Sequence, residues 1–464
     1  MNSPPDSDGK NEKASLDLSH SMLSNKIIFI VCLIVVIALI VDASMARISD
    51  LFSPNLSRTS GIMAVFILIS IAYFVGQFMI LSFVRYKSKE IHSQANMKFH
   101  RTYKFTMAVQ ITLSIILLFV ILQLVAMSYY FSIALIATTA TSYALAIAMM
   151  ALLMKSFLSW FRTSKNFVIL AYGVSAAILV VHLGFTLLLA ATALSEVPTE
   201  VRTAFSRPPF FMAGSITFIL NNMHDLSSIL SFSMLWVATV FLLHHYSRRV
   251  GRIKYWVVVT LPLVYFLSQF PALLLNIFDF LIEEDPFFYG YLLTLVFTLS
   301  KPAGGILFGI AFWIMSRNIP RTIAVRDYLT ISALGFVLLF ISDQAIVLIS
   351  IPYPPFGIAA VSIVGLSCYL IFVGIYYCAV SLSYDHKVRR EIKKVAIQES
   401  KLLGSIGSAQ LEEDITKKVM AITQRQDFTA QNLGVSSSLR EDDIKKYVEE
   451  VLHEIKAPKK EDSV

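Results

Sequence analysis

The chain has 464 residues, of which 56% are hydrophobic and 15% are charged, and it carries a formal net charge of +8. Soluble domains carry about 25% charged residues, so the composition excludes an ordinary soluble protein and indicates an all-α, polytopic bundle of transmembrane helices. The positive charge does not call for a nucleic-acid partner, because excess Lys and Arg in membrane proteins gather in cytoplasmic loops. The three cysteines, Cys32, Cys368 and Cys378, lie inside apolar runs and predict neither a disulfide framework nor a metal site.

Residues 1–25 are polar and mixed in charge, which predicts a disordered N-terminal tail. The first apolar run, Ile27 to Val41, ends at Asp42. Small residues at Ser44-Met45-Ala46 leave open a cleaved signal peptide. The segment before the run is long and slightly acidic instead of short and basic, so we favour an uncleaved anchor.

Nine further apolar runs are about 20 residues long, which is enough to cross the roughly 30 Å hydrocarbon core of a bilayer. The transmembrane domain is therefore expected to cover residues 26–383 with about ten helices. The nine runs are Gly61–Val84, Phe105–Met127, Ser132–Met154, Phe167–Leu194, Leu226–His245, Tyr255–Phe278, Gly290–Met315, Tyr328–Ile351 and Gly357–Leu382.

The loops between these runs differ in charge, and this difference predicts an orientation. Alternate loops, beginning with residues 85–104, carry sixteen Lys and Arg, whereas the intervening loops carry four. Loops rich in Lys and Arg stay in the cytoplasm, so we predict a multi-pass protein of the cell membrane with both termini cytoplasmic. Trp160, Trp256 and Trp313 fall at the predicted inner boundary, where an aromatic belt is expected.

One predicted span contains the sequence Ser300-Lys301-Pro302-Ala303-Gly304-Gly305. A lysine at the centre of a bilayer costs roughly 2.5–3.5 kcal/mol on insertion scales. Pro302 removes a backbone donor, and Gly304 and Gly305 loosen the same turn. We therefore expect a break in the helix at Pro302, Gly304 and Gly305.

Four polar residues of different spans are predicted to lie at a similar depth in the outer half of the membrane. A rise of about 1.5 Å per residue places Lys301 roughly 16 Å, and Asp343 about 12 Å, below the outer boundary. The two are natural ion-pair partners, and His182 and Gln269 lie at a similar depth. Lys301, Asp343, Gln269 and His182 are therefore candidate ligand-binding residues of a polar cavity for a small polar ligand or an ion. The alternative is a structural ion pair that locks two helices, with His182 and Gln269 bonded locally.

The cytoplasmic tail is predicted to be helical. No Gly or Pro intervenes between the last span and Gly404, so we expect one helix to leave the membrane and continue through residues 384–433, loosened at Gly404 and Gly407. Its apolar residues have heptad spacing, which allows a dimeric stalk. The alternative is an amphipathic helix that lies on the membrane or on the protein's own loops. Residues 434–464 predict a linker and a short amphipathic helix whose apolar stripe needs a partner.

Two stretches resemble known families. The sequence His453-Glu454-Ile455-Lys456-Ala457-Pro458 resembles the phosphoacceptor motif of sensor histidine kinases. That family adds a nucleotide-binding domain with Asn- and Gly-rich boxes, which this sequence does not contain, so we expect no complete kinase. The sequence Pro352-Tyr353-Pro354-Pro355-Phe356-Gly357, the last span and the tail are similar to a group of uncharacterised multi-pass archaeal membrane proteins. This resemblance implies a membrane fold and no particular activity, cofactor or ligand.

Enzyme signatures such as His-Glu-x-x-His, Gly-x-Ser-x-Gly and a P-loop are missing from the sequence, so we expect neither an enzyme nor a cofactor. We expect a receptor or sensor-like protein whose outer-half polar cavity is coupled through the last span to the tail. One alternative is a secondary transporter with its substrate or ion site at the Lys301-Pro302 break, although the first five spans lack the proline that an inverted repeat would have. The other is a structural scaffold. The expected partners are the bilayer, a small polar ligand or ion, and a cytoplasmic protein or second copy bound by the tail.

Overall fold

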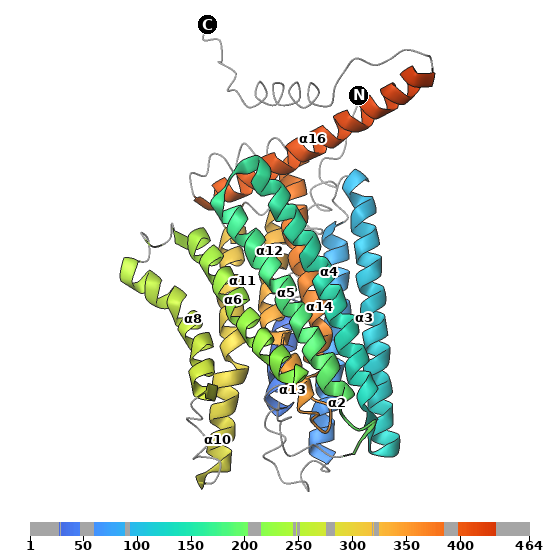
Figure 1. Cartoon of the computed structure of the whole chain (residues 1–464), viewed down its shortest axis with the longest axis vertical. Coiled ribbons are helices and arrows are strands. Elements are labelled where there is room, and N and C mark those ends of the chain that lie inside the picture. The colour runs from blue at the N-terminus through green and yellow to red at the C-terminus, as the bar shows by residue number, and fades with distance from the viewer. Residues whose placement is uncertain are drawn as a thin grey trace, which may run out of the picture.

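The structure is a computed structural model, and it describes residues 27, 29–46, 60–88, 93–202, 215–244, 247, 251–274, 284–317, 319, 324–384 and 398–432. Within these residues, ten helices are long and apolar enough to cross a membrane. Most of them lie side by side along the long axis of the molecule (Figure 1). The predicted all-α polytopic bundle is therefore confirmed.

The elements follow one another in a simple order. The first span is Phe29–Ala46. It is followed by α2 (Ser60–Ser88), α3 (Ser93–Met127), β1 (Tyr130–Phe131), α4 (Ser132–Ser164), α5 (Phe167–Ser195), β2 (Glu200–Val201), α6 (Ile216–Leu243), α8 (Arg252–Leu274), α10 (Pro286–Leu293), the π-helix η2 (Thr294–Thr298), α11 (Ser300–Arg317), α12 (Ala324–Ser342), α13 (Ala345–Ile349), α14 (Ile358–Tyr384) and α16 (Gln398–Asn432).

Helix α14 forms the core of the bundle, since every residue of its most apolar stretch is buried. Helix α8 lies at the edge of the bundle, and only 17% of the residues in its most apolar stretch are buried (Figure 1). Two glycines bring neighbouring helices against the α14 backbone. A Cβ atom on Gly374 would overlap Ser332 of α12, and one on Gly365 would lie 2.8 Å from the carbonyl oxygen of Ser142 in α4. These close approaches fix the position of α14 between α4 and α12.

The first span is tied to the start of α14 by one buried carboxylate. Asp42 accepts hydrogen bonds from the backbone N–H groups of Gly357 at 2.8 Å and of Ala360 at 2.9 Å. The first N–H groups of a helix lack intrahelical partners, so Asp42 acts as their cap. From the sequence we ended the first span at Asp42. The helix extends to Ala46, because the Asp42 carboxylate is hydrogen-bonded inside the bundle.

Helix α6 begins earlier than the sequence predicted. We expected residues 195–225 to form an outer loop, but α6 starts at Ile216, where the Ser215 side chain accepts from the backbone N–H of Phe218 at 3.1 Å. The first turns of α6 contain the polar residues Asn221, Asn222, His224 and Asp225, which lower the hydropathy and concealed the helix. The strands β1 and β2 pair antiparallel, with Tyr130 opposite Val201.

The tail does not continue the last span, and this part of the prediction was wrong. Helix α16 lies across the end of the bundle (Figure 1), and a Cβ atom on its Gly407 would lie 2.7 Å from Leu382 of α14. A straight helix continued from Tyr384 would carry residue 407 roughly 35 Å away from the end of the span. Helix α16 therefore packs against the end of α14 and is not its straight continuation.

Helix α16 is anchored to the end of α4 and to Asn166 at the start of α5. Trp160 donates its indole N–H to Gln410 at 2.8 Å, and Ser159 donates to Glu413 at 2.7 Å. Trp160 is fully buried by this contact, so of the three predicted belt tryptophans only Trp256 and Trp313, which are 39% and 44% exposed, stand at the surface.

The apolar side of α16 packs against the helix bundle of the same chain. Its heptad residues Leu402, Ile406 and Ala409 are buried against the bundle, so they are not free to form the dimeric stalk that we considered. Gly404 and Gly407 lie inside one unbroken helix instead of loosening it. The predicted C-terminal helix and His453 lie outside the described residues.

Candidate functional site

The span formed by α12 and α13 is interrupted at Asp343, one of the predicted site residues. Helix α12 ends at Ser342 and α13 begins at Ala345, which leaves Asp343 and Gln344 in a non-helical junction. Ser and Asp side chains compete with the backbone for hydrogen bonds and so favour helix ends. The sequence Ser342-Asp343-Gln344 thus explains an interruption that we did not predict.

Both carboxylate oxygens of Asp343 have partners from other helices. Oδ1 accepts a hydrogen bond from the Tyr143 hydroxyl of α4 at 2.8 Å. Oδ2 lies 3.0 Å from Lys301 Nζ of α11 and 3.1 Å from His182 Nε2 of α5. We call these four residues, Asp343, Lys301, His182 and Tyr143, the Asp343 cluster. The cluster joins four spans at a carboxylate that is 6% exposed.

The interruption also provides a second acceptor for Lys301. Its Nζ donates to the backbone carbonyl of Asp343 at 3.2 Å, in addition to the carboxylate. An ammonium group has three donors, and the described part of the chain supplies partners for two of them. The Lys301 side chain keeps 14% exposure. Within the described residues, the third donor of this lysine has no acceptor assigned to it.

The predicted pairing of Lys301 with Asp343 is present in the structure, and His182 joins it, but Gln269 does not. The Gln269 side-chain oxygen accepts from Ser300 Oγ at 3.3 Å, at the start of α11. Lys301 points to the carboxylate from the next position along the helix. Of the four candidate residues, three therefore meet at one point, and Gln269 lies beside them.

The helix break is also displaced from the predicted position. The π-helix η2 and Leu299 precede α11, which begins at Ser300, so Pro302 lies in the first turn, where a missing N–H removes no intrahelical bond. Helix α11 then runs unbroken through Gly304 and Gly305. A Cβ atom on Gly304 would overlap the Phe232 ring of α6, and one on Gly305 would lie 2.7 Å from Phe340 Cβ of α12. The two glycines thus permit close packing instead of loosening a turn.

Sequence reasoning missed a second polar group that extends from His182 to the surface of α6. His182 Nδ1 lies 3.1 Å from Ser227 Oγ, and the His182 and His224 rings are 4.9 Å apart between centroids. His224 Nδ1 lies 3.1 Å from Asp225 Oδ1. His224 and Asp225 were missed because we had placed the start of this helix at Leu226, and Ser227 was missed although it lies within the predicted span. Tyr143 was missed because a tyrosine in an apolar run carries no distinguishing mark.

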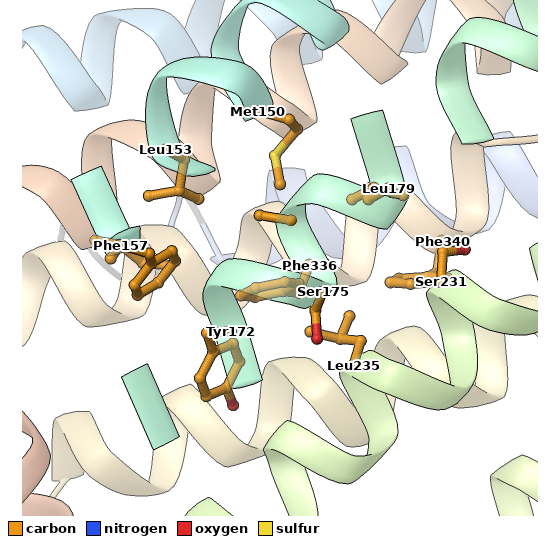
Figure 2. Close-up of a pocket in the computed structure, with 12 residues that line it drawn as sticks. Met150, Leu153, Phe157, Tyr172, Ser175, Leu179, Ser231, Leu235, Phe336 and Phe340 are labelled. Carbon is orange, nitrogen blue, oxygen red and sulfur yellow. The ribbon is translucent and has the colours of Figure 1, made fainter. Parts of the chain in front are cut away.

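A small cavity lies beside the Asp343 cluster, one helical turn along. Figure 2 shows Leu179, Ser231 and Phe340 among its lining residues, which are three or four positions from His182, Ser227 and Asp343 respectively. The lining is mostly apolar, and the volume of ≈ 20 Å³ is enough for about one water molecule. This cavity is not the polar cavity that we predicted, because its lining is mostly apolar.

Among the described residues, no group of three or more His, Cys, Asp and Glu is arranged to hold a metal ion. Comparison of the chain with protein-family models, curated proteins and solved structures found no match. The geometry of the Asp343 cluster and its connections to α16 is therefore the basis on which a function is inferred.

Proposed function

We propose that this multi-pass membrane protein is a receptor or sensor, in which a small polar ligand or an ion acts on the Asp343 cluster and displaces the tail helix α16. The proposal rests on one observation: α4 and α5 each contribute one residue to the cluster and contact α16 through a different residue. Helix α4 contributes Tyr143 to the cluster and Trp160 to the tail contact. Helix α5 contributes His182 to the cluster, and Asn166 before its first turn lies 3.4 Å from Ser405 of α16.

The distance between the two ends is short enough for a rigid connection. Tyr143 and Trp160 are seventeen residues apart on one unbroken helix, which corresponds to about 26 Å. Closely packed helices transmit a shift as a repacking of their contacts, because they do not deform continuously. A change at the carboxylate is therefore expected to alter the Trp160–Gln410 contact through a movement of α4. This route replaces the one through the last span that the sequence suggested.

The ligand class follows from Lys301 and Asp343. A ligand with an acceptor oxygen finds the remaining Lys301 donor, and an ion that neutralises or competes for Asp343 weakens the ion pair. Either event changes the balance between Lys301, His182 and Tyr143 around one carboxylate. A conformational change needs such a difference in interaction between two states.

The proposal can be tested by breaking the cluster and observing the tail. We would replace Cys32, Cys368 and Cys378, which are buried, and attach spin labels to cysteines placed at the exposed positions 163 and 417 of α4 and α16. Double electron–electron resonance in lipid nanodiscs then measures the distance distribution. Lys301→Met is expected to shift the distribution.

The matched control is Lys87→Met, which removes a lysine from the Lys87–Asp327 ion pair outside the cluster. This variant is expected to leave the distribution between α4 and α16 unchanged. An unchanged distribution in Lys301→Met would overturn the proposed coupling, because loss of the cationic partner of Asp343 would then have no influence on the tail.

A secondary transporter is the second candidate, and the interrupted spans favour it. Transporters often hold substrate where helices are discontinuous near the bilayer midplane. Here η2 and Leu299 precede Lys301, and the α12–α13 junction contains Asp343, so the two interruptions meet at one ion pair. This candidate requires access to the cluster from both sides of the membrane, whereas a receptor requires access from one side only. A structural scaffold, the third candidate, requires no access.

A further inference from the structure

A line of titratable side chains leads from the outer part of α6 to the buried carboxylate. Asp225, whose side chain is 37% exposed, lies 3.1 Å from His224, whose side chain is 5% exposed. The His224 ring is 4.9 Å from the His182 ring, and His182 Nε2 is 3.1 Å from Asp343 Oδ2. Exposure therefore falls steadily along Asp225, His224 and His182, and each residue contacts the next.

We propose that this line is a proton path and that Asp343 is the proton-binding group at its end. Proton relays in membrane proteins are commonly formed by chains of Asp, Glu and His side chains inside the membrane spans. Imidazole suits the inner positions because one ring nitrogen accepts a proton while the other donates one. The inference rests on the proposed function in one respect, since it names the proton as an ion that acts on the Asp343 cluster.

The transfer can be written with every proton accounted for. A proton from the outer solution binds Asp225 Oδ1 and moves to His224 Nδ1. His224 gives its other ring proton to His182 Nδ1, the nitrogen beside Ser227, through rotation of the ring or through one water molecule. His182 then breaks its Nε2–H bond and an O–H bond forms at Asp343 Oδ2. Both histidines end neutral, and one proton has moved without an oxidant or other reactant.

Protonation removes the negative charge from the centre of the cluster. Among the described residues, the groups that face the carboxylate are Tyr143 of α4, His182 of α5, Lys301 of α11 and Cys368 of α14. His224 of α6 and Lys301 are the charged or titratable neighbours that act on His182 besides Asp343. A neutral acid still bonds to Tyr143, but Lys301 loses its counter-charge. Lys301 is then free to bind another acceptor or to move toward solvent.

The test measures how fast Asp343 takes up a proton. Purified full-length protein in nanodiscs is subjected to a rapid drop in pH while time-resolved infrared spectroscopy records the C=O band of a protonated carboxyl group. Absence of the band in Asp343→Asn assigns it. Asp225→Asn and His224→Gln are each expected to slow its appearance by about tenfold, equivalent to about 1.4 kcal/mol in the barrier. The control is Glu200→Gln, which removes another exposed carboxylate and is expected to leave the rate unchanged.

Two results would overturn the path: a wild-type rate in both Asp225→Asn and His224→Gln, or a band that persists in Asp343→Asn. If Asp343→Asn does not fold, His182→Gln replaces it, because loss of this link is expected to abolish the fast rise. The spin-label distance to α16 is recorded in the same samples. Fast protonation with an immobile α16 would refute the sensor proposal while leaving the proton path intact.

Discussion

Removal of the Lys301 ammonium group is the perturbation whose energetic effect follows most directly from the structure. In Lys301→Met, Asp343 stays 6% exposed and keeps Tyr143 and His182, but it loses its cationic partner. Breaking one side of a buried ion pair costs about 3–5 kcal/mol, because a charge is left uncompensated. The Lys301 side chain is 14% exposed, so we expect the lower end of this range, about 3 kcal/mol.

Reversible unfolding in mixed micelles provides the assay, and two further variants make it specific. The double variant Lys301→Met/Asp343→Leu removes both charges and is expected to recover most of the loss, since apolar replacement of a buried pair is often neutral. Lys87→Met breaks a pair whose side chains are 11% and 29% exposed, and it is expected to cost about 1 kcal/mol or less. A cost for Lys301→Met no greater than that for Lys87→Met would refute the claim that burial controls the strength of this pair.

Three further predictions concern the contacts that hold the bundle and its tail. Asp42→Ala leaves the first turn of α14 uncapped and is expected to cost about 2 kcal/mol in unfolding free energy, measured by thermal unfolding in detergent. Trp160→Phe keeps the ring packing but removes the hydrogen bond to the tail, so α16 is expected to exchange its amide hydrogens faster while α5 does not. Gly374→Ala would place a Cβ atom 2.5 Å from the Tyr328 carbonyl and is expected to cost about 3 kcal/mol, whereas Gly184→Ala, with open space around it, is expected to be neutral or stabilising in the same unfolding assay.

The spans and the central ion pair could be predicted because their physical causes are local. A bilayer requires about 20 apolar residues per helix, and hydropathy alone reveals such runs. Lys301 and Asp343 each carry a large desolvation cost, so two opposite charges at one depth on consecutive spans are expected to meet. The structure places them 3.0 Å apart. The orientation with both termini in the cytoplasm stays a prediction from loop charge.

The errors arose where long-range contacts outweigh local pattern. The Asp343–Gln344 interruption is stable because Lys301, forty-two residues away, takes up the carbonyl that the break exposes. Helix α16 packs against the bundle because Leu402, Ile406 and Ala409 bury their apolar side there. Heptad spacing predicts an apolar stripe but does not identify the surface that covers it.

We placed the start of α6 too late because a low hydropathy predicts a loop. In the structure, several of these polar side chains have hydrogen-bond partners within the helix. His224 and Asp225 bond to each other, and Ser227 bonds to the His224 carbonyl at 2.9 Å. Polar residues with such partners cost little at membrane depth. The same error removed His224 and Asp225 from the list of candidate site residues.

Access of water-soluble reagents to the Asp343 cluster tests the central claim most directly. Ser227→Cys, nearly isosteric with serine, is placed next to His182 in a chain without other cysteines and labelled in oriented vesicles with an impermeant thiol reagent from each side. Labelling from the outside only, faster in Lys301→Met than in the parent chain, is the result that a sensor with an outward-facing site predicts. Labelling from both sides would favour the transporter, and no labelling from either side would contradict a ligand-responsive site and leave a dry structural ion pair.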